Sequence, residues 1–261
     1  MSLLKRLFLA SNILGASFAS VAATGGVALA ATPVKTVILV HGAWADGSSW
    51  SKLIPLLAAK GLNVVAVQLP LTSLEADAAV TKRAIDDADG PVLLVAHSWG
   101  GSVISQAGND PKVVGLVYIA ASAPDIGESF ADLIKPYPPA PALGDARQDA
   151  TGFFFLTPKG MAEDFAPDLP VAESSIMQVV QGPLSSVAFA GKATYAAWRT
   201  LPTWYIVAGN DRVIPIPLER SLAARMNATT ITIESSHVVM LSHPKEVFAF
   251  IETALATLAK R

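Results

Sequence analysis

Four near-continuous runs of apolar residues, separated by stretches typical of helices, constrain the fold of this chain more than any other feature. The runs cover residues 36–40, 64–68, 92–96 and 113–120. Strands that are apolar along their whole length are buried on both faces, as they are in a parallel sheet covered by helices. The pattern therefore predicts an α/β fold.

The segments around these runs continue the same alternation of helices and strands. The further expected elements are helices over residues 49–60, 73–88 and 217–226 and from about Pro244, and strands over residues 203–208 and 229–233. Together with the four runs, these segments make six strands. We expect a six-stranded, mostly parallel sheet with helices on both faces.

The regular alternation stops after the fourth run. Residues 124–183 hold nine of the 18 prolines in the chain, and they also hold several phenylalanines that need a surface to bury against. We interpret this stretch as an insertion that forms a cap over the carboxyl edge of the sheet, extending over about residues 124–200. No internal repeat and no Gly/Ser linker divides the chain further.

The composition excludes several classes of protein. Hydrophobic residues make up 52% of the chain and charged residues 15%, a balance that excludes intrinsic disorder. The formal net charge is −2, and Lys and Arg form no cluster beyond the extreme N-terminus, so nucleic acid is not an expected partner. The chain has no cysteine, which excludes disulfides and thiolate sites. No metal-binding or nucleotide-binding motif is present, and we expect no metal and no cofactor.

The first thirty residues have the pattern of a secretory signal peptide. Lys5 and Arg6 precede an apolar stretch without acidic residues, and Ala28-Leu29-Ala30 fits a cleavage site. We expect residues 1–30 to be removed on export and residues 31–261 to form the mature domain, in the periplasm or outside the cell. A retained membrane anchor is the alternative, which the polar residues within the stretch disfavour. The sequence leaves the oligomeric state open.

Ser98 is the candidate nucleophile, because it directly follows the third expected strand in the run Ala96-His97-Ser98-Trp99-Gly100. A serine on a sharp strand-to-helix turn, with small residues two positions before and after it, is the pattern of a nucleophile elbow. Ala96 and Gly100 are small enough for strand and helix to approach each other. The alternative is that Ser98 only caps the following helix.

Two backbone amides are candidates for an oxyanion hole. The first expected strand runs into His41-Gly42-Ala43-Trp44, where glycine lets the chain turn at the carboxyl edge of the sheet. An oxyanion hole next to an elbow combines the amide after the nucleophile with one amide from such a loop. We therefore expect the amides of Ala43 and Trp99 to form it.

His237 is the candidate general base among only four histidines. His41 and His97 come too early if the chain order is serine, acid, histidine. His237 follows the last strand in a loop that can reach over the elbow, whereas His243 precedes Pro244 at the start of a helix, where capping explains it. His243 therefore remains the alternative.

Asp211 is the candidate acid that orients the base. It lies in the turn Gly209-Asn210-Asp211, directly after the fifth strand, at the same sheet edge as His237. Asp125, which follows the fourth strand, is the alternative. Either residue could instead be a turn-forming aspartate.

Together these motifs resemble the α/β-hydrolase superfamily across residues 34–258, and within it the small esterases related to plant methylesterases and hydroxynitrile lyases. The motifs are His41-Gly42-Ala43-Trp44, His97-Ser98-Trp99-Gly100-Gly101, Asn210-Asp211 and Ser236-His237. In the lyases of this group, a Lys follows the catalytic His and a Thr follows the His of the first motif. Val238 and Gly42 stand at these positions here, so the resemblance implies the esterase pattern.

The expected activity is cleavage of a carboxylic ester through an acyl-enzyme, with a small-molecule ester as the partner. Trp44, Phe130 and Phe154 are expected to line the pocket, which favours apolar or aromatic substrates; these aromatics could instead only hold the cap on the sheet. A lactonase or a cofactor-free perhydrolase would use the same triad. A ligand-binding protein that retains the scaffold without turnover is a further alternative.

Overall fold

The main sheet has six strands, all parallel, in the order β2-β1-β3-β4-β8-β9. The computed structural model describes residues 33–261, and the expected signal peptide lies outside them. The strands are β1 (Thr36–Val40), β2 (Asn63–Ala66), β3 (Val92–His97), β4 (Val113–Ile119), β8 (Thr203–Ala208) and β9 (Thr229–Ile233). The expected α/β class and strand number are confirmed.

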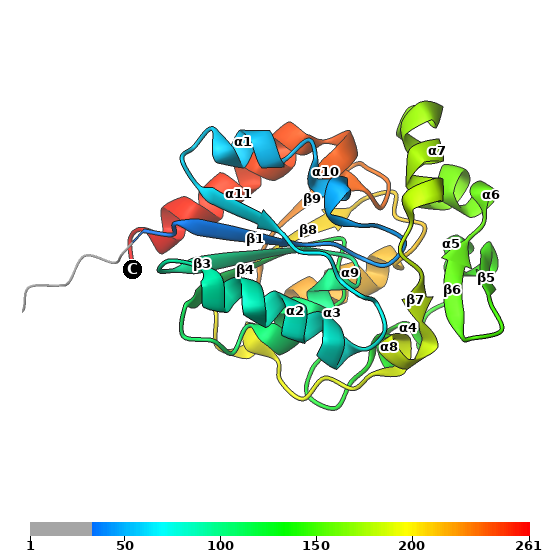
Figure 1. Ribbon diagram of the computed structural model, residues 1–261, viewed down its shortest axis with the longest axis horizontal. Helices are drawn as coiled ribbons and strands as arrows, with labels where there is room; N and C mark the ends of the chain where they lie inside the picture. Colours follow the sequence, from blue (N-terminus) through cyan, green and yellow to red (C-terminus); the bar gives the residue numbers. More distant parts are fainter. Residues whose placement is uncertain (1–32) are drawn as a thin grey trace, which may run out of the picture. The chain divides into compact units, whose positions relative to one another are not determined.

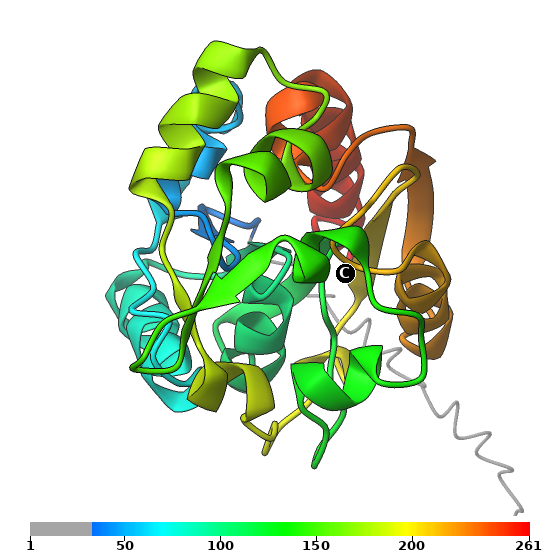
Figure 2. The ribbon, with the colours of Figure 1, turned by 90° about the vertical axis from the view of Figure 1, so that its right-hand side faces the viewer.

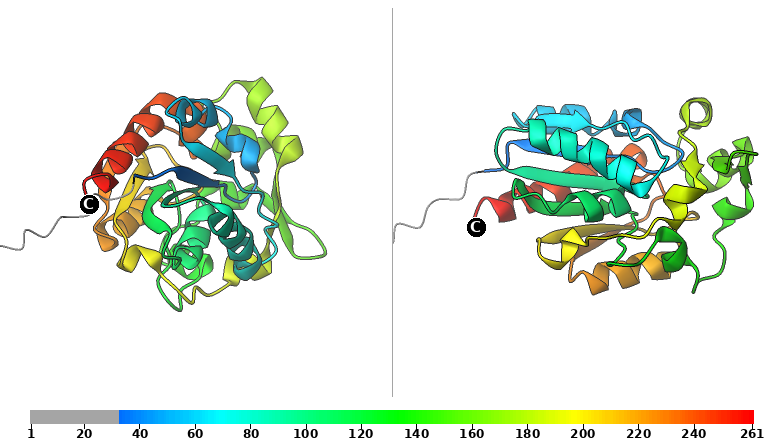
Figure 3. Two further views of the ribbon diagram at one scale, coloured as in Figure 1. Left: turned by 60° about the vertical axis from the view of Figure 1, so that its left-hand side comes forward. Right: turned by 60° about the horizontal axis from the view of Figure 1, so that its bottom comes forward.

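Helices cover both faces of this sheet (Figures 1 and 3). On one face lie α1 (Ile54–Ala58) and α11 (Pro244–Leu258), and on the other lie α2 (Leu74–Asp87), α3 (Gly100–Ala107) and α9 (Ile216–Arg225).

One expected helix differs from the structure. Residues 49–60 form a short 3₁₀ turn, η1 (Gly47–Trp50), followed by α1. Pro55 stands at the start of α1. Proline has no N–H to donate to the preceding turn, so a continuous helix cannot pass through this position and a new one begins there.

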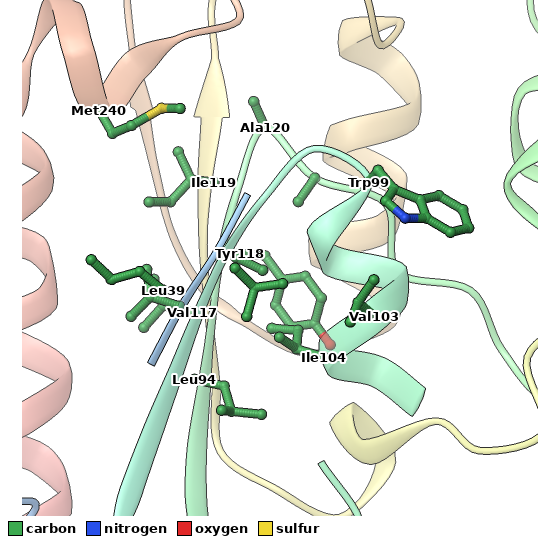
Figure 4. Packing of buried hydrophobic residues seen from close by; sticks show 14 of the residues in the cluster. Leu39, Leu94, Trp99, Val103, Ile104, Val117, Tyr118, Ile119, Ala120 and Met240 are labelled. Carbon is green, nitrogen blue, oxygen red and sulfur yellow. The ribbon is translucent and has the colours of Figure 1, made fainter. Parts of the chain in front are cut away.

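The core lies where the central strands meet the helices. Every residue of β1, β3 and β8 is buried, which is the physical reason why these strands show no polar alternation. In Figure 4, Tyr118 of β4 lies against Val103 and Ile104 of α3, and all three are completely buried. Full burial of an aliphatic side chain stabilises the fold by about 1.5–3 kcal/mol. This packing holds α3 against β4, the neighbour of β3 in the sheet.

The insertion forms a cap at the carboxyl edge of the main sheet (Figures 1 and 2). Its elements are α4 (Phe130–Ile134), α5 (Pro141–Gly144), β5 (Ala146–Gln148), β6 (Phe153–Leu156), α6 (Pro158–Gly160), the π-helical turn η2 (Met161–Phe165), α7 (Val171–Val180), β7 (Leu184–Ser185), α8 (Ser186–Ala190) and the 3₁₀ turn η3 (Ala197–Arg199). The small antiparallel sheet β5-β6-β7 was not expected. Its strands have two to four residues, too few to show a periodic pattern.

Within residues 33–261, no helix combines the length and the apolar character that crossing a membrane would require.

Candidate active site

Ser98 occupies a strained turn between β3 and α3. Its φ angle is 53°, in the left-handed region that residues other than glycine rarely adopt, and its side chain is buried. Two hydrogen bonds fix the turn, from the Ser98 N–H to the Ile119 carbonyl and from the Ser122 N–H to the Ser98 carbonyl, at 3.2 and 3.1 Å. This is the strand-turn-helix geometry that the sequence pattern predicted for a nucleophile.

The glycines after Ser98 permit a close approach between α3 and its neighbours. A Cβ atom at Gly100 would lie 2.4 Å from the Val40 carbonyl oxygen, and one at Gly101 would lie 2.0 Å from the Ser122 carbonyl oxygen. These contacts involve backbone atoms, which cannot swing aside as a side chain can.

Changing Gly101 to alanine is expected to destabilise the protein by more than about 3 kcal/mol, because relief of the overlap requires a shift of the α3 backbone. Urea unfolding measures this change in free energy. Gly144→Ala is the matched control, since a Cβ there meets no atom within 4 Å. Equal stability of the two variants would contradict the argument.

The loop after β1 brings a second amide to Ser98. A Cβ atom at Gly42 would lie 2.6 Å from the Ser98 Cβ, so only glycine allows the loop to come this close. The next amide, from Ala43, makes no hydrogen bond within residues 33–261, and neither does the Trp99 amide. Both expected oxyanion-hole donors are therefore available to a ligand.

His237 and Asp211 form a buried hydrogen-bonded pair. The His237 Nδ1–H donates to Asp211 Oδ2 over 2.5 Å, and Asp211 Oδ1 accepts the N–H groups of Val213 and Ile214 at 2.6 and 2.9 Å. The other ring nitrogen, Nε2, is buried and has no hydrogen-bond partner in the described part of the chain. A neutral imidazole in this tautomer has its accepting nitrogen unoccupied, as a general base requires.

His97 places this pair next to the elbow. Its Nε2–H donates to the His237 carbonyl over 2.9 Å, and the two ring centroids are 4.5 Å apart. Burial lowers the pKa of His97 well below its ordinary value, so its ring stays neutral and acts as a hydrogen-bond donor. His41 is also structural: it accepts the Leu69 N–H at 2.9 Å, and burial lowers its pKa.

The two alternatives from the sequence lie elsewhere. Asp125 pairs with the Arg199 guanidinium at 2.6 Å and does not contact His237. His243 directly precedes α11, and its Nδ1 contacts the Ser242 hydroxyl. Neither residue joins the pair of Asp211 and His237.

A cavity of about 390 Å³ opens beside Ser98 between the sheet edge and the cap. Trp44, Phe130 and Phe154 line it, and so does Phe189, which the sequence did not single out. The Phe189 ring packs edge-on against Phe130 and at a tilt against Phe154, with centroid distances of 5.2 and 5.9 Å. The lining is mostly apolar; besides the Ser98 hydroxyl, Gln148 contributes a polar side chain.

Glu219 of α9 is a buried acid beside Asp211 that sequence reasoning missed. Its side chain is fully buried, and Oε2 accepts the Ala208 N–H at 3.1 Å. Burial raises the pKa of Glu219 well above its ordinary value, and the negative charge of the neighbouring Asp211 carboxylate raises it further. This raised pKa favours the protonated form of Glu219 next to Asp211. Nothing in the local sequence distinguishes Glu219 from an ordinary charged residue of a surface helix.

Changing Glu219 to glutamine is expected to remove a pH dependence of stability. At pH values above 4.5, the ordinary pKa of a glutamate, Glu219 keeps its proton in the folded chain but releases it in the unfolded chain. The free energy of unfolding of the wild type therefore falls as the pH rises towards the folded-state pKa, by at most about 1.4 kcal/mol per pH unit. Urea unfolding at about pH 5 and about pH 8 tests this. Relative to the wild type, the free energy of unfolding of Glu219→Gln should be higher at about pH 8 than at about pH 5. An equal difference at the two pH values would refute the expectation.

No group of three or more His, Cys, Asp or Glu residues suited to a metal ion occurs among residues 33–261.

Comparison with known proteins decides the family. A family model described as the alpha/beta hydrolase family matches residues 37–250. The chain belongs to this alpha/beta hydrolase family. This alpha/beta hydrolase is 27% identical over 246 residues to a pyrethroid hydrolase of Sphingobium wenxiniae, covering 82% of this chain and 85% of that protein. It is also 24% identical over 249 residues to an alpha-hydroxynitrile lyase of Arabidopsis thaliana, covering 84% and 96%.

Solved structures agree on the fold of this alpha/beta hydrolase. A crystal structure of a pyrethroid hydrolase covers 87% of this chain with all of its own, at a TM-score of 0.78 and 24% identity. That of polyneuridine aldehyde esterase covers 84% of this chain with 99% of its own, at a TM-score of 0.74 and 23% identity. The resemblance drawn from the motifs is confirmed. Because esterases and a lyase match about equally well, identity alone does not assign the substrate.

Proposed function

We propose that this alpha/beta hydrolase is a serine esterase that cleaves carboxylic esters of small apolar or aromatic substrates. The observation that carries the proposal is the buried pair of His237 and Asp211. The Nε2 of His237 has no hydrogen-bond partner within residues 33–261, and its ring lies against that of His97, the residue directly before Ser98. An unoccupied base next to a strained serine and two available amides is the combination that acyl transfer needs.

In the proposed reaction, Ser98 Oγ attacks the ester carbonyl carbon while His237 Nε2 takes the hydroxyl proton. The Ala43 and Trp99 amides bind the oxygen that becomes negative, and Asp211 stabilises the protonated ring. The tetrahedral intermediate then loses the alcohol, which receives the proton from His237. A water molecule attacks the acyl-enzyme by the same route and releases the acid.

The residue after the base supports an esterase over a lyase, and esterases are among the similar proteins. Two of the similar proteins are a pyrethroid hydrolase and methylesterase 3 of Arabidopsis thaliana, and the second is 24% identical to this chain. Val238, a buried apolar residue, follows His237, whereas the resemblance implies a lysine there in the lyases.

The cavity supports the substrate class. Its volume of about 390 Å³ lies near the lower end of the range for small-molecule sites, roughly 300–1,000 Å³. Its aromatic walls offer apolar contact area and few hydrogen bonds. An apolar or aromatic ester with a short acyl chain fits these properties.

The test is hydrolysis of p-nitrophenyl acetate, butyrate and octanoate by the purified protein. We expect turnover of the acetate and butyrate esters and a lower kcat/KM for octanoate, because the cavity has limited volume. Absence of turnover with all three esters and with an aromatic methyl ester or a lactone would favour a ligand-binding protein on the same scaffold.

A further inference from the structure

One short cap segment, residues 161–169, contacts both loops that carry the acid and the base. On the acid side, the Asp164 carboxylate, which is almost fully buried, accepts the Arg212 Nε–H at 2.7 Å. The Arg212 carbonyl in turn accepts the N–H of Ala142, a cap residue in α5, at 3.1 Å. The residue directly after Asp211 is therefore held by the cap through its side chain and its backbone.

On the base side, Asp168 accepts three hydrogen bonds from the two residues before His237. Its Oδ2 accepts the Ser236 N–H at 2.8 Å and the Ser235 hydroxyl at 3.2 Å. Its Oδ1 accepts the Ser236 hydroxyl at 2.5 Å. A carboxylate that accepts several hydrogen bonds from one short segment restricts the position of that segment strongly.

Phe165, between these two aspartates, covers the base itself. Its ring is completely buried, and its centroid lies 5.1 Å from that of His237, at an interplanar angle of 62°. The cap thus contacts the imidazole ring directly, in addition to the backbone that leads to it.

We infer that Asp168 is a positioning residue that holds the His237 ring in its orientation toward Ser98. The cap then forms part of the catalytic apparatus. This inference rests on the proposed esterase function. The backbone of His237 is held from two sides: the core, through His97, binds its carbonyl, and the cap, through Asp168, binds the residues that lead to its amide. If the cap side is released, the ring can rotate away from Ser98 while the core contact persists.

The expected consequence is a loss of rate without a loss of substrate binding. A displacement of a catalytic group by about 1 Å can lower the rate about 100-fold. Asp168 does not line the cavity beside Ser98, so its removal leaves the substrate contacts in place. A purely structural residue would instead lower stability without a selective effect on kcat.

The test compares Asp168→Ala, Asp168→Asn and the control Glu163→Ala, using p-nitrophenyl butyrate as substrate. Glu163 belongs to the same cap segment, its side chain is largely exposed, and it lies 3.9 Å from the Lys159 ammonium. We expect Asp168→Ala to lower kcat by about 10- to 100-fold with KM changed less than about two-fold. Asparagine, which keeps one accepting oxygen, should restore part of the rate, and Glu163→Ala should match the wild type.

A second measurement separates this inference from the proposed function. The Nδ1–H proton between His237 and Asp211 is buried, and its NMR signal should broaden in Asp168→Ala and stay sharp in Glu163→Ala. If the wild type hydrolyses no ester, the proposed function fails, and the NMR result alone decides the positioning role. Unchanged kcat and an unchanged proton signal in a folded Asp168→Ala would overturn the inference. If that variant does not fold, Ser236→Ala, which removes the 2.5 Å contact, is measured in the same way against the same criteria.

Discussion

Replacing Ser98 with alanine is expected to lower kcat for p-nitrophenyl butyrate by about 10⁴- to 10⁶-fold, because the acyl-enzyme can no longer form. Residual turnover would come from binding and from the two amides of the oxyanion hole. KM and the unfolding midpoint should change little, since only one oxygen atom is removed and the hydroxyl is not hydrogen-bonded to the His237 Nε2. Steady-state kinetics and labelling by a fluorophosphonate, which reacts with an activated serine, measure the effect.

The matched control for this experiment is Ser102→Ala. Ser102 lies one helical turn further along, is equally buried, and its hydroxyl contacts the Ser122 hydroxyl at 2.7 Å. Its loss should cost about 1 kcal/mol of stability and leave kcat and fluorophosphonate labelling near those of the wild type. Full activity of Ser98→Ala would show that the nucleophile has been assigned to the wrong residue.

Asp211→Asn is expected to lower kcat by about 10⁴-fold through the tautomer of His237. Oδ1 of Asp211 accepts two backbone N–H groups, at Val213 and Ile214, so the amide oxygen of asparagine should take that place. The amide NH₂ then points at Nδ1 of His237, which must accept a hydrogen bond. The ring proton moves to Nε2, and the atom that should take the proton from Ser98 is blocked.

Asp125→Asn is the control, because Asp125 is the other aspartate that the sequence offered as the acid. It pairs with Arg199 near the surface and does not line the cavity beside Ser98, so its loss should leave kcat within about two-fold. Steady-state kinetics of both variants decide between the two residues. A large effect at Asp125 together with a small effect at Asp211 would reverse the assignment.

The candidate site could be predicted from the sequence where its chemistry depends on local chain geometry. Ser98 follows a strand and precedes a helix, and the small residues around it indicate that this strand and this helix approach each other closely. The choice between Asp211 and Asp125 could only be ranked, because each follows a strand at the same sheet edge. The contact with His237 over 2.5 Å separates them, and that contact depends on how the two loops fold toward each other.

The insertion itself was predicted, but the elements within the cap could not be, for a different reason. Its strands and helices are short, and proline and phenylalanine occur in it without a period, so no hydropathy pattern distinguishes its elements. Asp168 reads as a turn residue, and Glu219 as an exposed residue of a helix. Their positions beside Ser236 and Asp211 depend on contacts with partners far away in the chain.

By itself, the sequence determined the α/β class, the six strands and the turn at Ser98, because burial on both faces and close backbone approach restrict which residues a local segment can contain. The tertiary structure alone decided which acid meets the base, which aromatics line the cavity, and that the cap holds the loop of His237. These features arise from hydrogen bonds and packing between segments distant in the chain, and such contacts leave no periodic signal in either segment.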